Sequence, residues 1–320
     1  MSIDPAQALA AVVPPELREL LRGRQLVLAR PVGGPHAGRH ASVRAGLGDQ
    51  FRGHRPYAPG DDPRRLDWRA VARRDRLVLR QTDAEDALSL VLLVDGGGGM
   101  AHGVGDANKL RHAAGLAGAL AHLALRQGDR VGFACGRAGA AELAQVRPQA
   151  GASRLAALAH ALLRAPEGVC PWPALVAGAA PTLPRRSLVV LLSDLLDPDP
   201  TRPDADEQLL RGLAAVRSRG HDVVLVQVLH RDELEFPWTG QGLWRFEDAR
   251  GVRAPLEGRA AGMRDAYLAR LRAHLEQLER ACAGAGLHLH RSVTDAPLTA
   301  ALLALLARLS GRPEPAEARP

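Results

Sequence analysis

The spacing of the hydrophobic positions changes at about residue 88. From there on, continuous apolar runs alternate with longer segments whose apolar residues recur at helical spacing. Apolar runs of roughly four to eight residues are typical of strands buried on both faces of a parallel sheet, and their alternation with helices is typical of a doubly wound α/β fold. We predict strands at 88–95, 130–136, 187–194, 222–229 and 287–293, and helices at about 108–126, 152–164, 173–180, 204–219, 260–283 and 298–309.

The first eighty residues lack this pattern. They are rich in Gly, Pro and Arg and hold no long periodic apolar segment, although 25–29 and 76–80 resemble short strands. We therefore predict an irregular, partly β, Arg-rich region over residues 1–80. A mostly parallel α/β domain follows over 81–310, with an insertion at about 231–258, and residues 311–320 form a Pro-rich, flexible tail.

The composition is that of a globular protein. Of 320 residues, 46% are hydrophobic, which is enough to bury a sizeable core. No stretch approaches the ~20 apolar residues of a membrane-spanning helix, and the first residues do not resemble a signal peptide, so we expect a cytoplasmic protein. Cys135, Cys170 and Cys282 are far apart and lack a C-x-x-C spacing, which argues against a disulfide framework or a thiolate metal site.

The net charge of +7 is confined to one region. Residues 1–80 hold 15 Arg and 8 acidic residues, whereas residues 81–320 are balanced at 27 of each sign. Every basic residue except Lys109 is an arginine, a bias that a GC-rich genome also produces. Phosphate contacts by these arginines would give salt-sensitive nucleic-acid binding, which we keep as an alternative function.

Two predicted strands end in a carboxylate. Asp95 closes the strand at 88–95, and Asp194, preceded by Ser193, closes the strand at 187–194. Ligands bind at the carboxyl ends of strands in open parallel sheets, and hard oxygen ligands suit Mg²⁺ or Mn²⁺. The alternative, which the spacing favours about two to one, is that each Asp caps the turn or helix after its strand.

Other chemical motifs are weak or absent. Gly96, Gly98 and Ala101 fit G-x-G-x-x-A, but the second strand lacks the acidic residue that would hold a ribose. There is no P-loop, G-x-S-x-G or H-E-x-x-H motif. An Asp-dependent hydrolase using Asp95 and Asp194 remains a second alternative, although a haloacid dehalogenase would need an Asp where this chain has Gly97.

The most distinctive segment runs from residue 51 to residue 95. Within it, PYAPGDDP reads as a turn in which Asp61 or Asp62 caps a short helix and Pro63 takes the first helical position. The charged residues that follow could form ion pairs at helical spacing, with Trp68 as an apolar anchor. A purely structural role would be to fasten the N-terminal region to the sheet.

This segment carries a family resemblance. R-P-Y-x-P-G-D-D-P-R-R-L-D-W, followed by A-R-x-x-x-L and an acidic stretch, resembles the bacterial and archaeal family called domain of unknown function 58. The resemblance extends over about residues 38–309, and the C-terminal portion is similar to a von Willebrand factor A domain. The motif residues, within 55–68, are Arg55, Tyr57, Gly60, Asp61, Asp62, Arg64, Arg65, Asp67 and Trp68.

The resemblance implies a degenerate metal-ion-dependent adhesion site. Such A domains bind a divalent cation through D-x-S-x-S, a Thr and a later Asp. Asp95 and Asp194 match the two aspartates, but Gly97 and Gly99 stand at the serine positions, and Cys170 or Pro171 stands where the Thr is expected. No cofactor is therefore certain, and we expect at most weak binding of Mg²⁺ or Mn²⁺.

The resemblance also implies a function. Members are commonly encoded beside MoxR-type AAA+ ATPases, so we expect a non-enzymatic protein-interaction module that acts as adaptor or partner of such an ATPase. The expected partner-binding edge consists of Asp95, Gly97, Gly99, Ser193 and Asp194.

Overall fold

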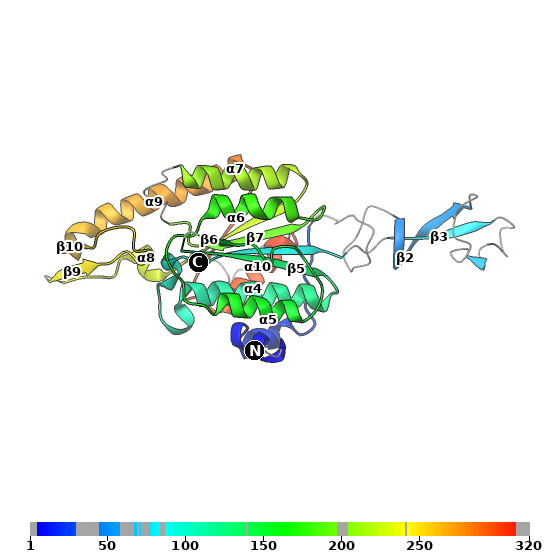
Figure 1. The fold of residues 1–320 in the computed structure, drawn as a ribbon, viewed down its shortest axis with the longest axis horizontal. Helices are drawn as coiled ribbons and strands as arrows, with labels where there is room; N and C mark the ends of the chain where they lie inside the picture. Colours follow the sequence, from blue (N-terminus) through cyan, green and yellow to red (C-terminus); the bar gives the residue numbers. More distant parts are fainter. Residues whose placement is uncertain are drawn as a thin grey trace.

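The computed structural model describes residues 5–29, 45–57, 67, 68, 71, 77–83, 87–138, 140–196, 204–240 and 242–311. Among these residues, a six-stranded sheet is covered by helices on both faces (Figure 1), which confirms the predicted doubly wound, mostly parallel α/β class. Within this sheet, only the last strand runs antiparallel to its neighbour. The order is β11 (His288–Val293), β8 (Asp222–Leu229), β7 (Leu188–Ser193), β4 (Ser89–Asp95), β5 (Arg130–Arg137) and β6 (Ala140–Glu142).

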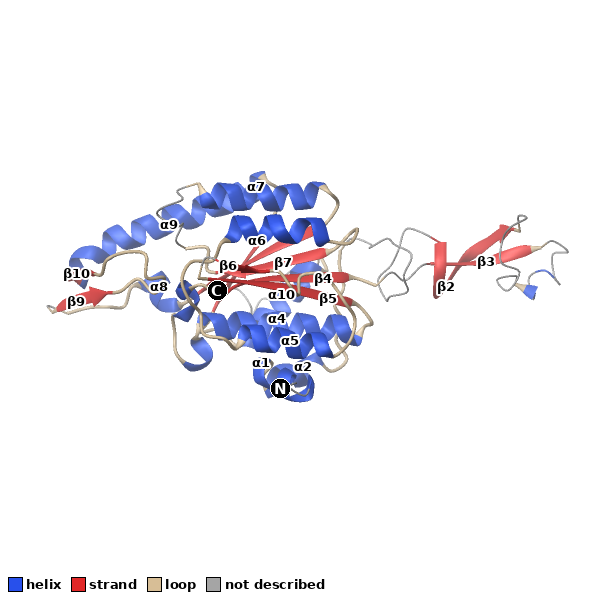
Figure 2. Cartoon of the chain, viewed as in Figure 1, coloured by secondary structure: helices blue, strands red, loops and turns tan. Residues whose placement is uncertain are grey.

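Each face of the sheet has its own core. Successive residues of a strand point to opposite faces, so Leu90 and Leu92 of β4 belong to one apolar cluster and Val91 and Leu93 to the other. The predicted helices all form, with ends within one or two residues of the expected ones. The helices α4 (Lys109–Arg126), α5 (Ser153–Leu162) and α10 (Leu298–Leu309) cover the first face, and α6 (Trp172–Ala179), α7 (Ala205–Ser218) and α9 (Ala260–Gly284) cover the second (Figure 2).

The N-terminal residues pack against this domain as two helices, α1 (Pro5–Val12) and α2 (Pro15–Leu21). We did not predict them, because helices this short show little apolar periodicity. Leu17 and Leu21 are buried in the same core as α4 and α10.

The strand predicted at 25–29 is wrong. Its backbone is extended but joins no sheet, because the Gln127 side chain accepts from the Leu26 N–H at 2.6 Å and donates to the Leu26 carbonyl at 3.1 Å. The Ala29 N–H donates to the carbonyl of Leu309 at 2.9 Å. A side chain and a helix end thus supply the partners that a neighbouring strand would have supplied.

The family motif begins in the last residues of β2 (Ala45–Pro56) and precedes β3 (Val78–Asp83). These two strands form a separate antiparallel pair, which lies away from the central sheet (Figure 1). Trp68 is 65% exposed, so the prediction that it is an apolar anchor is wrong. The backbone N–H groups of Tyr57 and Asp67 donate to carbonyls beside and within β3. Arg55 lies in β2, whereas Gly60, Asp61, Asp62, Arg64 and Arg65 lie outside the described residues.

The insertion after β8 contains α8 (Arg231–Glu235) and an antiparallel hairpin of β9 (Leu243–Phe246) and β10 (Leu256–Arg259). It has a small core of its own, in which the Phe236 ring lies 5.0 Å from the rings of Trp238 and Tyr267. This core fixes the base of the hairpin, and the loop between β9 and β10 returns toward the carboxyl ends of the central strands.

Candidate functional site

The carboxyl ends of β4 and β7 form the switch point of the sheet. These strands are neighbours, but the chain leaves β4 toward β5 on one side and leaves β7 toward β8 on the other. Ligands of doubly wound folds bind where the strand order reverses in this way. Asp95 and Asp194 both lie there, 4% and 2% exposed, as do Ser193 and the glycine run. The structure therefore brings together the residues of the expected partner-binding edge.

Asp95 is held by hydrogen bonds from its own surroundings. Its Oδ1 accepts from the Gly97 N–H at 2.7 Å, and its Oδ2 accepts from the Ser193 hydroxyl at 2.6 Å. Burial, followed by the nearby Asp194 carboxylate, raises the pKa of Asp95 to about 6. The neighbouring charge that raises the pKa shows that the two aspartates face the same small volume.

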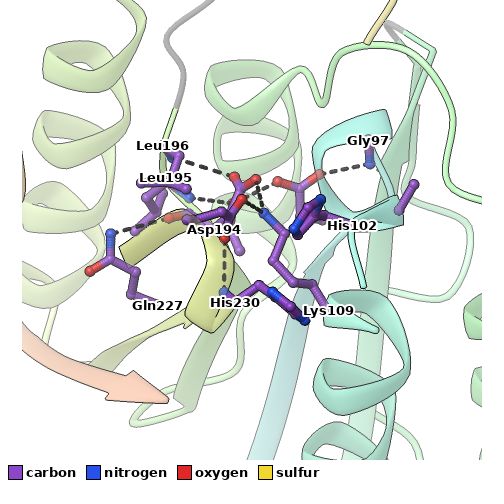
Figure 3. Close-up of polar contacts among 12 residues, drawn as sticks. Gly97, His102, Lys109, Asp194, Leu195, Leu196, Gln227 and His230 are labelled. Atoms are coloured by element: carbon purple, nitrogen blue, oxygen red, sulfur yellow. Dashed lines mark hydrogen bonds and ion pairs between the residues drawn. The ribbon is translucent and has the colours of Figure 1, made fainter. Parts of the chain in front are cut away.

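Asp194 is neutralised by two cations of the same chain. The Lys109 Nζ lies 2.9 Å from its Oδ2 (Figure 3). Nη2 of Arg250 lies 3.2 Å from both carboxylate oxygens. The Leu196 N–H also donates to Oδ1 at 3.4 Å. Burial alone would raise the pKa of Asp194, but the charges of Lys109 and Arg250 outweigh it and hold the pKa below its ordinary value.

Lys109 is the only lysine in the sequence, and its side chain is 1% exposed. It is the first residue of α4, where the helix dipole disfavours a positive charge. The preceding Asn108 caps the helix by accepting from the Arg111 N–H at 3.0 Å, and it donates to the carbonyl of Ala101 at 2.8 Å. The cap and the loop therefore fix the backbone from which Lys109 reaches the switch point.

Glu233 of α8 is the second carboxylate on Lys109. Its Oε1 lies 2.6 Å from Nζ, and its Oε2 accepts from the His230 N–H at 2.8 Å. In return, Nδ1 of His230 accepts from the Asp232 N–H at 3.1 Å, which completes a capping box at the start of α8. Burial would lower the pKa of Lys109, but Asp194 and Glu233 together raise it above its ordinary value.

The glycine run is covered by two loops. The Gly98 N–H donates to the Gly168 carbonyl at 2.8 Å, and a Cβ on Gly98 would overlap the carbonyl of Ala249 in the insertion. A Cβ on Gly99 would lie 2.6 Å from Asp194 Oδ2 and would overlap the Arg250 guanidinium. A side chain at position 99 would therefore require the Arg250 and Asp194 side chains to move.

Cys170 lies where the family resemblance places a threonine ligand. A Cβ on Gly97 would lie 3.1 Å from the Cys170 backbone nitrogen, so this loop reaches the glycine run. Burial, followed by the Asp95 carboxylate to which the thiol hydrogen-bonds, raises the pKa of Cys170 well above its usual range. The thiol therefore stays neutral and is a poor ligand for a hard divalent cation.

The described residues do not fit the divalent cation that the resemblance implies. All four carboxylate oxygens of Asp95 and Asp194 are engaged by donors of the same chain, and Gly97 and Gly99 offer no side-chain oxygen. Among the described residues, His102, His230 and Asp232 form the one further group with metal-ligand spacing. His230 already uses its Nδ1 lone pair to cap α8.

A groove of about 1040 Å³ lies beside the switch point. Its walls come from α1 and α2 and from loops at the carboxyl edge, including residues 103, 105–108, 110–112, 162–166 and 294–299. The wall residue Leu163 is 55% exposed, and Val104, between the wall residues Gly103 and Gly105, is 86% exposed. The edge thus combines a sealed polar centre with an open, partly apolar groove.

Sequence reasoning found the two aspartates but missed Lys109, Glu233 and Arg250. Lys109 could have been identified from the sequence, because it is the one lysine among 42 basic residues and begins the helix after the strand predicted at 88–95. No sequence pattern links Glu233 and Arg250 to that strand, because both come from the insertion.

The fold and the site define a doubly wound α/β protein with an aspartate pair at its switch point. A family model described as "Protein of unknown function DUF58" matches residues 53–277, and the chain belongs to this family. The uncharacterised proteins Rv1480 of Mycobacterium tuberculosis and Mb1516 of Mycobacterium bovis are 28% identical over 289 residues, which are 88% of this chain and 86% of each relative.

Among solved structures, the pilus adhesin SpaC of Lactobacillus rhamnosus GG in its open conformation matches 70% of this chain and 30% of its own. The two chains share 12% sequence identity over this match, with a TM-score of 0.45.

Proposed function

We propose that this protein is a non-enzymatic protein-interaction module, an adaptor or partner of a MoxR-type AAA+ ATPase. In this proposal, residues 81–310 are a von Willebrand factor A-like domain with a degenerate metal-ion-dependent adhesion site. The observation that carries the proposal is that the carboxylate pair at the switch point is sealed by groups of the same chain, while the edge around it stays open.

The sealed carboxylates favour binding over hydrolysis. A nucleophilic or general-base aspartate needs an oxygen free to approach a substrate or a water molecule. The Asp95 oxygens instead accept hydrogen bonds from Gly97 and Ser193. The Asp194 oxygens accept from Lys109 and Arg250. Hydrolysis through these aspartates is therefore the less supported alternative.

The open edge favours a protein partner. The groove is slightly larger than the ~300–1000 Å³ of typical small-ligand sites, and it is bounded by helices and loops of mixed polarity. Leu163 in its wall and Val104 in the loop beside it are exposed and offer apolar contacts. The ATPase as partner class comes from the family resemblance, in which members are commonly encoded beside MoxR-type ATPases.

Nucleic-acid binding remains the other alternative. Most of the fifteen arginines that would carry it lie in residues 30–80, much of which falls outside the described residues. A mobility shift with DNA or RNA that weakens steeply with salt would favour this alternative over the adaptor role.

Co-purification tests the proposal. The full chain, carrying an affinity tag, is expected to capture the AAA+ ATPase encoded nearest to its gene in at least one nucleotide state, with ATP, ADP or no nucleotide present. Val104→Glu is expected to weaken capture by roughly tenfold or more, because an unpaired carboxylate would be buried under the partner.

Val27→Glu is the matched control. Val27 is 47% exposed and follows Leu26, which contacts the far end of α4, at the opposite edge of the sheet. Capture by this variant should equal that of the wild type. No complex in any nucleotide state, or equal loss in both variants, would contradict docking at the carboxyl edge.

A further inference from the structure

We propose that the Lys109 ammonium takes the place of the divalent cation at the switch point, so that this chain carries its own cation and binds no metal there. The inference concerns the chain alone. It can therefore fail while the adaptor role stands, and it can hold if no ATPase partner is found.

Lys109 occupies the position of a cation at this site. Its Nζ lies 2.9 Å from the carboxylate of Asp194, which follows β7 (Figure 3), and 2.6 Å from the Glu233 carboxylate of α8. These are the distances of charge-assisted hydrogen bonds. An ammonium group supplies positive charge and directed donors to oxygen ligands, which is the electrostatic task of a bound metal in such a site.

The charges at the switch point leave no place for a further divalent cation. Lys109 and Arg250 bring two formal positive charges to Asp95, Asp194 and Glu233, which bring three negative ones, and the site is left with one negative charge. A further divalent cation would make the buried site positive and would repel both side chains. Without Lys109 and Arg250, the three carboxylates would instead attract a divalent cation strongly.

The Arg250 side chain fills space that a metal ligand at position 99 would need. A Cβ on Gly99 would overlap the Arg250 guanidinium, so a serine at this position would require Arg250 to move. In this proposal the Arg250 side chain of the insertion takes the space of one hydroxyl ligand. A side chain, unlike a bound ion, cannot dissociate.

The experiment is Mn²⁺ binding followed by electron paramagnetic resonance, with thermal unfolding in Mg²⁺, Mn²⁺ or EDTA beside it. All proteins carry Asp232→Asn, so that the His102, His230 and Asp232 group does not take up the probe. With Lys109 present, the full chain is expected to bind no Mn²⁺ at the switch point, and its melting temperature should not change with the metals or EDTA.

Lys109→Met is expected to gain an Mn²⁺ site and to be stabilised by added Mn²⁺. Lys109→Gln, which keeps a donor without the charge, is the second variant in case the first does not fold. A further Asp194→Asn change should remove the gained site. The inference is overturned if the chain with Lys109 binds Mn²⁺ that Asp194→Asn removes, or if neither Lys109 variant responds to Mn²⁺ more than the chain with Lys109.

Discussion

Removing the Lys109 ammonium tests how much the buried ion cluster contributes to stability. In Lys109→Met the side chain keeps a similar length but loses its charged end, so Glu233 loses its cation and Asp194 keeps only Arg250. At 2.9 Å and an effective dielectric constant of ~20, the attraction between Lys109 and Asp194 is about 6 kcal/mol before desolvation is counted. Because burial of the ammonium offsets part of this, the expected loss is the ~3–5 kcal/mol typical when one partner of a buried pair is removed.

The assay is urea and thermal unfolding followed by circular dichroism. For a chain of this size roughly 2 °C is lost per kcal/mol, so the melting temperature should fall by about 6–10 °C. Arg111→Met is the matched control, because Arg111 lies two residues further along α4 and its ion pair with Asp106 is exposed. That variant should unfold like the wild type.

A second substitution separates charge from packing. Lys109→Met combined with Glu233→Gln should recover part of the lost stability, because the double variant no longer buries an unpaired carboxylate. A loss below about 1 kcal/mol in Lys109→Met, the size of an exposed pair, would refute the reasoning. So would a double variant less stable than the sum of the two single changes.

Three further predictions concern the same site. Gly98→Ala should lower the melting temperature, since its Cβ would overlap the backbone of the insertion. Gly262→Ala in α9, which has open space around it, should be neutral or stabilising by about 0.5–1 kcal/mol. Equal effects of the two variants in urea unfolding would contradict this prediction. An amine-reactive reagent should leave Lys109 unmodified in the folded chain and modify it in urea, as peptide mass spectrometry can check. Asp95, whose pKa is raised from 3.8 to about 6, binds its proton more tightly when folded, so its contribution to the free energy of unfolding should decline as the pH rises from 4 to 6 and beyond. The difference in that free energy between wild type and Asp95→Asn should decline over the same range, and a flat or rising difference would disprove the assignment.

The sheet and its helices could be predicted because each element has its own local signal. The run at residues 88–95 is continuous and apolar, and the structure buries every residue of β4. The order of the strands could not be predicted in the same way, because doubly wound sheets occur with several orders. The observed order places Asp95 beside Asp194.

The occupants of the site could not be predicted because they depend on long-range packing. Glu233 and Arg250 reach the switch point only because the aromatic core around Phe236 positions the insertion. The helix α2 is buried for a similar reason, since Leu17 and Leu21 find their partners on α4 and α10 rather than on their own segment. The spacing of residues along the chain does not indicate such contacts.

The packing of α2 against α10 has a consequence for how the protein is made. Leu21 leaves the ribosome long before Leu298, and at about 5–20 residues per second the gap between them is roughly 15–60 s. During that time the apolar face of α2 has α4 but not α10 to pack on. We expect part of this face to stay exposed until synthesis reaches the last helix.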